Sequence, residues 1–335
     1  MIYIGMDIHK NFIQACAMDS KGNVLKEQRM GTEETKEFIK LFKGYAIKAA
    51  IESTCNWYYV YDTLELLGVD TVLVNVRRTR VIAESKIKTD KLDAKTIAHC
   101  LRTGFIAESW IPPRKTRELR NIVRHRLSLR KEIARFKNKL HSIVLRNGIK
   151  HEYSDLFGRK GMEFLRNLEL KGSDKYKLQS YLRILESLME EKQRADNKIS
   201  QLCKMDENAM LLTSIKGISY YSAMVIVSEI GNVKRFPNPK KLCSYAGLVP
   251  RTIQSGNHVY HGRIIKECNQ NLKWILNQCV HLHIRFCKEN QITKLYYRVM
   301  KKKEKNKATI AVSRKMLTII WHMLMKGEEV KCKCQ

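Results

Sequence analysis

The first hundred residues switch repeatedly between two patterns of apolar positions. Short runs rich in apolar and β-branched residues, bounded by turn residues such as Lys21, Gly22 and Asn23, are typical of strands. Stretches in which apolar residues recur every three or four positions are typical of helices. The strand-like runs cover residues 2–8, 12–18, 23–30, 46–51 and 71–76, and the helix-like stretches cover residues 33–42 and 57–67. This segment is predicted to form a sheet covered by helices.

The order of these elements indicates the topology of the sheet. Three strands joined by short turns form an antiparallel meander, whereas strand-helix-strand units place their strands parallel. A meander followed by such units predicts a mixed sheet of the ribonuclease-H and RuvC-like type. Actin-like ATPases share that opening, so the fold alone does not decide the function. The glycine-rich phosphate loops that such an ATPase or a sugar kinase needs are not evident in the sequence.

Most of the remaining chain has a helical pattern. Helical apolar stripes cover residues 114–150, 175–203 and 308–327, and the second of these suits either an antiparallel partner for the first or a dimerising coiled coil. The predicted fold class is therefore α/β + α. It comprises a RuvC-like mixed sheet in residues 1–110, a basic helical or coiled-coil middle in residues 111–205, and a mostly α-helical C-terminal domain in residues 206–335.

The charge of the chain narrows the choice of partner. It carries 63 Lys and Arg against 33 Asp and Glu, a formal net charge of +30. Such a chain attracts polyanions and releases counterions when it binds nucleic acid, so DNA or RNA is the expected partner. A run of charge is usually a solvated face, but solvated faces usually mix signs, whereas residues 114–150 carry 13 Lys and Arg against Glu118 and Glu132 alone. Candidate phosphate contacts on this predicted helix are Arg114, Lys115, Arg120, Arg124 and Arg130.

The sequence does not indicate a membrane or an oxidising compartment. No stretch reaches the roughly 18 uncharged apolar residues that a transmembrane helix requires. The N-terminus lacks the basic leader and apolar run of a secretion signal. The ten cysteines show no paired framework and are interpreted as reduced thiols. We therefore expect a cytoplasmic protein with no membrane partner.

Four acidic residues fall where a metal-binding nuclease would need them. Asp7 and Glu52 end two predicted strands that would be neighbours, and ligand sites in such sheets lie beyond the carboxyl ends of strands. Asp90 and Asp93 are spaced i, i+3 in a predicted helix capped by Thr89, so both carboxylates share one face. Converging acids need a counter-charge, which two Mg²⁺ ions bridging a phosphate would supply. Taken singly, each acid is better explained by a helix N-terminus or a strand end.

Two features in the second half of the chain offer contacts to a phosphodiester. A helix ending at Lys216, a turn at Gly217 and a following apolar helix resemble one helix-hairpin-helix unit, whose turn amides can hold a backbone phosphate. Residues 251–256 are predicted to form a loop that exposes Ser255 beside Gly256. Ser255 is a candidate nucleophile, although a serine before glycine is ordinarily a turn residue.

A further set of residues has a spacing close to that of metal ligands. Cys279, His283 and Cys287 lie at i, i+4 and i+8 on a predicted helix. Zinc would want a fourth ligand, and such a stripe is more often part of a buried core. We expect core packing at this stripe rather than zinc.

The order and spacing of the motifs match a known family over nearly the whole chain. The matching residues are Asp7, Glu52, Thr89-Asp-Lys-Leu-Asp-Ala94, Lys216-Gly-Ile218, Glu229-Ile-Gly231, Arg235-Phe236, Tyr245-Ala-Gly-Leu-Val-Pro250, Ser255-Gly256 and Lys266-Glu-Cys-Asn269. With these residues the chain resembles the DEDD-type insertion-sequence transposases, which are related to the Piv-type DNA invertases. It departs from their pattern at Cys268, where members commonly have glycine, and at Lys273, where they commonly have arginine.

The resemblance implies a mechanism and a set of partners. Asp7, Glu52, Asp90 and Asp93 correspond to the RuvC-like acids that bind Mg²⁺ in that family. Ser255 corresponds to a serine in the C-terminal transposase domain that attacks the DNA backbone and forms a covalent phosphoserine intermediate. The two halves meet in a composite site across protomers, which implies a homo-oligomer, a dimer or a tetramer. A structured guide RNA, the bridge RNA, pairs with donor and target DNA.

Several alternatives remain open on the sequence alone. Arg251, Lys266 and Asn269 are candidate phosphate contacts, and roles as surface or capping residues are at least as well supported. The protein can also be a junction-resolving nuclease in which water, activated by the four acids, cuts DNA and Ser255 is structural. A third possibility is a catalytically silent nucleic-acid-binding protein that relies on its basic helices. The resemblance further implies a prokaryotic, nucleoid-associated location.

Overall fold

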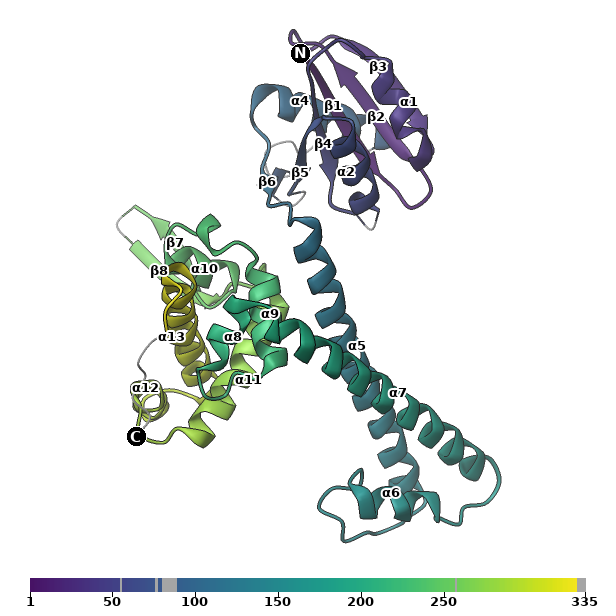
Figure 1. Ribbon diagram of the computed structural model, residues 1–335, viewed down its shortest axis with the longest axis vertical. Helices are drawn as coiled ribbons and strands as arrows, with labels where there is room; N and C mark the ends of the chain where they lie inside the picture. Colours follow the sequence, from purple (N-terminus) through teal and green to yellow (C-terminus); the bar gives the residue numbers. More distant parts are fainter. Residues whose placement is uncertain (55, 76–77, 80–88, 257, 330–335) are drawn as a thin grey trace. The chain divides into compact units, whose positions relative to one another are not determined.

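The computed structural model describes residues 1–54, 56–75, 78–79, 89–256 and 258–329. The chain forms two compact units, Met1–Pro112 and Pro113–Gln335 (Figure 1). Each unit has its own hydrophobic core and is described by itself. The division of the second unit near residue 205 stays a prediction.

The first unit is built on a mixed sheet, as the sequence predicts, and the sheet has a sixth strand that was not predicted. Its strands are β1 (Ile2–Ile8), β2 (Ile13–Met18), β3 (Val24–Met30), β4 (Ile47–Glu52), β5 (Asp70–Val74) and β6 (Glu108–Ser109), in the order β3-β2-β1-β4-β5-β6. The meander β1-β2-β3 is antiparallel, and β1-β4 and β4-β5 are parallel. β1 and β4 therefore lie side by side in the middle of the sheet, and their carboxyl ends meet at one edge.

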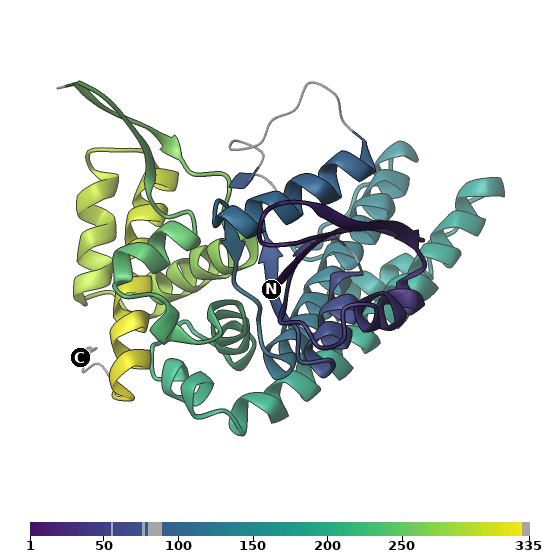
Figure 2. The same ribbon diagram turned by 90° about the horizontal axis from the view of Figure 1, so that it is seen from above.

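Helices cover both faces of this sheet (Figures 1 and 2). The helices α1 (Thr35–Lys40) and α2 (Trp57–Leu66) pack on the face that carries Ile4 and Met6 of β1. The helix α4 (Asp90–Thr103) packs on the opposite face. Successive side chains of a strand point to opposite faces. The odd-numbered residues of β1, including Asp7, therefore face α4.

The second unit begins with two long helices that pack against each other. α5 (Arg114–Arg146) and α7 (Gly172–Lys204) run antiparallel and are joined through the short helix α6 (Arg159–Arg166) (Figure 1). Leu140, Leu178 and Leu185 are fully buried between them. Residues 175–203 were predicted to form either an antiparallel partner for the helix of residues 114–150 or a dimerising coiled coil. The structure shows the antiparallel pairing within the chain.

The rest of the second unit is mostly helical around the largest core of the protein. It comprises α8 (Glu207–Thr213), α9 (Tyr220–Ile230), α10 (Pro239–Tyr245), α11 (Gln270–Phe286), α12 (Gln291–Met300) and α13 (Lys305–Lys326). α9 is buried over most of its surface, which explains why its sequence is apolar on all sides. A two-stranded antiparallel hairpin, β7 (Pro250–Ser255) and β8 (His258–Ile264), interrupts the helices.

The hairpin corrects one prediction. Residues 251–256 were expected as a loop, but all except Gly256 belong to β7, and Ser255 pairs with His258 of β8. An exposed hairpin has polar residues on both faces, so the alternation of apolar and polar positions that reveals a half-buried strand is weak here. Gly256 has a φ of +56° at the tip, a conformation that glycine adopts readily.

Candidate metal centre and serine hairpin

Asp7 and Glu52 stand at equivalent points of two neighbouring strands. The last paired residues of β1 and β4 are Met6 and Ile51, and each acid comes one position later. Parallel neighbours lie about 4.8 Å apart across a sheet, so the two acids occupy the same edge. The side chain of Asp7 is 6% exposed and Glu52 is half-buried. This confirms where the sequence predicts these acids to lie along the strands.

Asp90 reaches this edge because α4 approaches β1 unusually closely. Gly5 of β1 faces α4, and a Cβ atom at this position would lie 2.2 Å from the carbonyl oxygen of Ala94. Only glycine permits such an approach. Asp90 is the first residue of α4, and the Thr89 hydroxyl accepts a hydrogen bond of 3.3 Å from the Leu92 amide, as a helix N-cap does. The predicted capped helix is therefore present.

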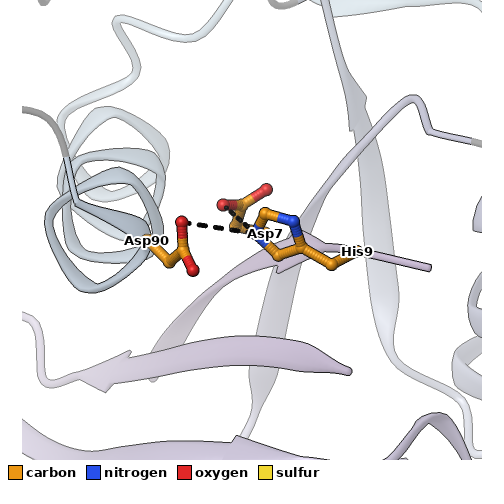
Figure 3. Close-up of side chains that lie close together, drawn as sticks. All are labelled: Asp7, His9 and Asp90. Carbon is orange, nitrogen blue, oxygen red and sulfur yellow. Dashed lines mark hydrogen bonds and ion pairs between the residues drawn. The ribbon is translucent and has the colours of Figure 1, made fainter. Parts of the chain in front are cut away.

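His9 contacts both carboxylates through one ring nitrogen (Figure 3). Its Nε2 atom is 3.0 Å from Oδ2 of Asp7 and 3.5 Å from Oδ1 of Asp90. The imidazole stacks on the Phe12 ring at 4.4 Å, and the Arg29 guanidinium covers that ring at 3.7 Å. Sequence reasoning missed His9. The available signal was its position two residues after Asp7, which places both side chains on the same face when the extended backbone continues.

The donor atoms of Asp7, His9 and Asp90 fit a divalent cation. One ligand atom from each residue lies within 4.8 Å of the other two. Two carboxylates suit Mg²⁺, which prefers oxygen ligands, and the imidazole adds a nitrogen that transition metals favour. Asp93 lies one turn further along α4 and is half-buried. Among the described residues the three-membered group includes neither Asp93 nor Glu52.

Ser255 belongs to the second unit, whereas the four acids belong to the first. Ser255 is the last residue of β7, and its side chain is outside the described part of the structure. Arg251, near the start of β7, and Lys266, after β8, are both exposed. Each remains a candidate phosphate contact, Arg251 on the same hairpin as Ser255 and Lys266 just after it.

A buried carboxylate lies at the base of this hairpin. Glu229 in α9 is fully buried and receives two hydrogen bonds of 2.8 Å from the guanidinium of Arg124 in α5. Asn269 and Asn271 donate further hydrogen bonds of 2.8 Å and 3.0 Å. Burial opposes ionisation, but the hydrogen bonds and the charge of Arg124 outweigh it and hold the pKa of Glu229 below its usual range. In the sequence, Glu229 stood out only as part of the motif Glu229-Ile-Gly231.

The Glu229 network joins the two ends of the hairpin segment. Tyr245, at the end of α10, donates from its hydroxyl to the backbone carbonyl of Glu229 at 3.2 Å. Asn269, at the start of α11, donates to the same hydroxyl at 3.0 Å, and its backbone amide donates to the Tyr245 carbonyl at 2.9 Å. Gly247 has a φ of +66°, and a Cβ there would lie 2.4 Å from Sγ of Cys268. The chain before β7 and the chain after β8 are thus held together.

The predicted phosphate contacts on α5 divide into two groups. Arg114 and Lys115 are exposed, and Arg130 lies over the Trp274 ring at 4.9 Å. Arg120 is instead 8% exposed and donates to the backbone carbonyls of Ser228 and Glu229 at 2.8 Å and 2.9 Å. Its guanidinium is used inside the protein, because the C-terminal carbonyls of α9 need donors. We therefore do not propose Arg120 as a phosphate contact. Arg124 also binds Glu229, with 44% of its side chain exposed.

Gly217 lies against α11. It has a φ of +98°, and a Cβ atom there would come within 2.7 Å of the backbone nitrogen of His283. Close packing therefore accounts for a glycine at this position. The helix before the turn, α8, ends at Thr213 rather than at Lys216.

The stripe of Cys279, His283 and Cys287 is buried, as predicted. Nδ1 of His283 donates to the carbonyl of Lys216 at 2.7 Å, and its Nε2 accepts from the Asn290 amide. Burial raises the pKa of the Cys279 thiol to about 12. Both ring nitrogens and the neutral thiol thus serve the packing of α11 against its neighbours.

None of the helices in the described part of the chain combines the length and apolar character needed to cross a lipid bilayer.

Two parts of the sequence match known families. Residues 4–147 match a family described as "Transposase", and residues 209–298 match the "Transposase IS116/IS110/IS902 family". The first match contains Asp7, His9, Glu52, Asp90 and Asp93, and the second contains Glu229 and Ser255.

Individual proteins are similar over most of the chain. The transposase for insertion sequence element IS1533 of Leptospira borgpetersenii is 30% identical, over 71% of this chain and 72% of that protein. The transposase for insertion sequence element IS1111A of Coxiella burnetii is 25% identical, over 98% of this chain and 91% of that protein. The transposase for insertion sequence element IS1328 of Yersinia enterocolitica is 22% identical, over 97% of both.

Proposed function

Because this chain belongs to the IS116/IS110/IS902 family of transposases, we propose that it cuts and rejoins DNA strands to move an insertion sequence. The observation that best supports this chemistry is the convergence of Asp7 and Asp90 on one point beyond the carboxyl end of β1. A second support is the net charge of +30, which favours a nucleic-acid substrate. The RuvC-like identity of the mixed sheet is part of the proposal.

Asp7, Glu52, Asp90 and Asp93 are the residues that would hold Mg²⁺. The ion would polarise a phosphate oxygen and stabilise negative charge as the phosphodiester reacts. The protein contributes the alignment of the carboxylates, which follows from the β1-β4 register and from the close packing of α4 on Gly5. It also contributes His9, whose Nε2 atom lies within reach of both the Asp7 and the Asp90 carboxylate.

Ser255 is the proposed nucleophile. Its Oγ atom would attack the phosphorus of a DNA phosphodiester and lose its proton to solvent or to an acid of the site. The P–O bond to one sugar breaks, that sugar oxygen takes up a proton from solvent and leaves as a free hydroxyl, and a phosphoserine ester keeps the other strand end. Attack by a sugar hydroxyl on this ester reverses the step and joins new strand ends. No external energy source is needed, because the phosphoserine ester conserves the energy of the broken phosphodiester bond for rejoining.

The same reaction requires that the acids and Ser255 act on one phosphate. We propose that they do so in a homo-oligomer, a dimer or a tetramer, bound to donor and target DNA. A structured guide RNA, implied by the family resemblance, would pair with both DNAs. The exposed Arg114 and Lys115, together with Arg251 and Lys266, are the proposed backbone contacts.

Strand cleavage by single-residue variants tests the proposal. The full chain, with DNA from the ends of its element and the transcript of the adjoining non-coding DNA, is incubated with and without Mg²⁺. Asp7→Asn and Asp90→Asn are expected to lower the cleavage rate by about 10²-fold or more, as loss of a metal ligand does. Cleavage at the normal rate by either variant, or in EDTA, would contradict the metal assignment. Cleavage by Ser255→Ala at the normal rate would instead favour water as the nucleophile.

A further inference from the structure

The surface formed by α11, α12 and α13 combines strong positive charge with exposed aromatic rings. These three helices pack against one another (Figure 1). Between residues 285 and 307 the sequence has nine Lys and Arg and two Glu. Within the described residues, Glu304 is the acid of this stretch that forms an ion pair, and its carboxylate lies 3.6 Å from the Lys307 ammonium group. The remaining cations face solvent without an acidic partner among the described residues.

Two adjacent hollows mark this surface. One, of about 720 Å³, is lined by Arg285, Lys288, Tyr297 and Lys305, among others. The second, of about 560 Å³, is lined by the lysines of residues 301–303. Met300 lines both, so the hollows adjoin. The surface is therefore a continuous concave path with cations along it.

An exposed tyrosine stands in this path. Tyr297 is 47% exposed, and the edge of its ring is held against Tyr296 at 5.5 Å. Phe286, 63% exposed, lies at the end of α11 next to Arg285. Large exposed aromatic rings cost free energy in water, and their burial against a ligand recovers it. Rings beside cations are the combination that binds unpaired bases, because each base stacks on a ring while its phosphate meets a cation.

We propose that the α11–α12–α13 surface, defined by Arg285, Lys288, Tyr297 and Lys301 to Lys305, binds a single strand of nucleic acid. A duplex keeps its bases stacked inside, so it would use the lysines but not the rings. A single strand uses both. The inference does not depend on the metal centre or on Ser255, and it assigns this surface no part in the chemical step.

Fluorescence anisotropy with the full chain in EDTA tests the proposal. The probes are a labelled 20-nucleotide oligouridine RNA, a 20-nucleotide oligothymidine DNA and a 20-base-pair duplex. Tyr297→Ala is expected to weaken single-strand binding about tenfold, within the range for loss of one stacked base, and to leave duplex binding within twofold. Tyr297→Phe keeps the ring and is expected to bind normally. Thermal unfolding of each variant shows that the protein stays folded.

The lysines give an independent readout. The triple variant Lys301→Ala, Lys302→Ala and Lys303→Ala is expected to lower the slope of log affinity against log salt by about 2 for the single strands, near 0.7 per lost phosphate contact. The matched control for the lysines is the triple variant Lys171→Ala, Lys175→Ala and Lys177→Ala, and the control for the ring is Tyr176→Ala. All four residues are exposed at the start of α7. Tighter binding of the RNA or of the DNA probe identifies which strand the surface prefers. Equal losses on single strand and duplex for Tyr297→Ala, or equal effects of the control variants, would overturn the proposal.

Discussion

The Nε2 atom of His9 lies 3.0 Å from the carboxylate of Asp7 and 3.5 Å from the carboxylate of Asp90. A cation bound by the two acids would therefore have this nitrogen within reach as a third ligand. Imidazole binds Ni²⁺ well, whereas Mg²⁺ prefers oxygen.

His9→Ala is expected to weaken Ni²⁺ binding by about tenfold and to leave Mg²⁺ binding nearly unchanged. Isothermal titration calorimetry of the full chain measures both affinities. His99→Ala, an exposed histidine further along α4, is the matched control and is expected to change neither affinity at this site. Equal weakening of both metals would show that His9 supports the acids without ligating the ion.

Gly5→Ala is expected to disturb the metal centre without touching any of its acids. The added methyl group would meet the Ala94 carbonyl at 2.2 Å and the Ala98 amide nitrogen at 2.4 Å, so α4 and Asp90 must move away from β1. Overpacking of this kind costs about 1–3 kcal/mol of unfolding free energy. Calorimetry is expected to show weaker Mg²⁺ binding together with a lower melting temperature. For Gly158→Ala, whose new Cβ would lie 3.4 Å from the Asp155 carbonyl oxygen, neither change is expected.

Glu229→Gln is expected to lower the free energy of unfolding by about 3 kcal/mol at pH 7, because the Arg124 guanidinium loses the buried carboxylate that it binds. The folded protein holds the pKa of Glu229 below that of an unfolded glutamate, so the stabilisation is present above the unfolded pKa, near 4.3, and is lost as the pH falls through the folded pKa. The difference between wild type and variant should therefore shrink in acid.

Urea unfolding at pH 7 and at pH 3.5 measures this difference. Glu186→Gln provides the control, since Glu186 pairs with Arg166 at the surface. A surface pair contributes less than about 1 kcal/mol, and its loss is expected to have little effect. A Glu229→Gln difference that grows as the pH falls would show that the carboxylate is not held ionised.

Arg120 and its neighbours on α5 are expected to respond to mutation in opposite ways. Arg120→Ala removes the arginine donor from the buried Ser228 and Glu229 carbonyls, of which the second keeps the Tyr245 hydroxyl, so we expect a loss of about 1–3 kcal/mol in unfolding free energy. The double variant Arg114→Ala and Lys115→Ala should keep its stability and lower the salt slope of duplex DNA binding by about 2, one unit for each exposed cation. Chemical unfolding and anisotropy titrations at several salt concentrations separate the two effects. A stable Arg120→Ala protein with a reduced slope would restore Arg120 as a phosphate contact.

Local sequence signals accounted for the elements that carry the acids. The apolar runs at residues 2–8 and 46–51 placed Asp7 and Glu52 at strand ends, and Thr89 marked the start of α4, because such runs and N-caps depend on near neighbours. The approach of α4 to Gly5 and the position of His9 depend on tertiary packing. They have no local signature strong enough to predict the site's geometry.

The basic helix shows the opposite case. The sequence predicted the α5 helix and its apolar stripe, and both are present. It could not show that Arg114 is exposed while Arg120 is buried, because the hydrogen-bond partner of Arg120, the Ser228 carbonyl, lies 108 residues further along the chain. The hairpin around Ser255 escaped prediction for a different reason, since neither of its faces packs on a continuous core that would impose alternation.

The identity of the nucleophile is the central claim, and one measurement tests it most directly. The wild-type protein is stopped during DNA cleavage with denaturant, digested, and examined by mass spectrometry for a peptide linked to nucleotide. The account predicts phosphodiester-linked DNA on Ser255, and no adduct in Ser255→Ala or in Asp7→Asn. Cleaved DNA with free ends and no peptide adduct, or an adduct that persists in Ser255→Ala, would contradict it.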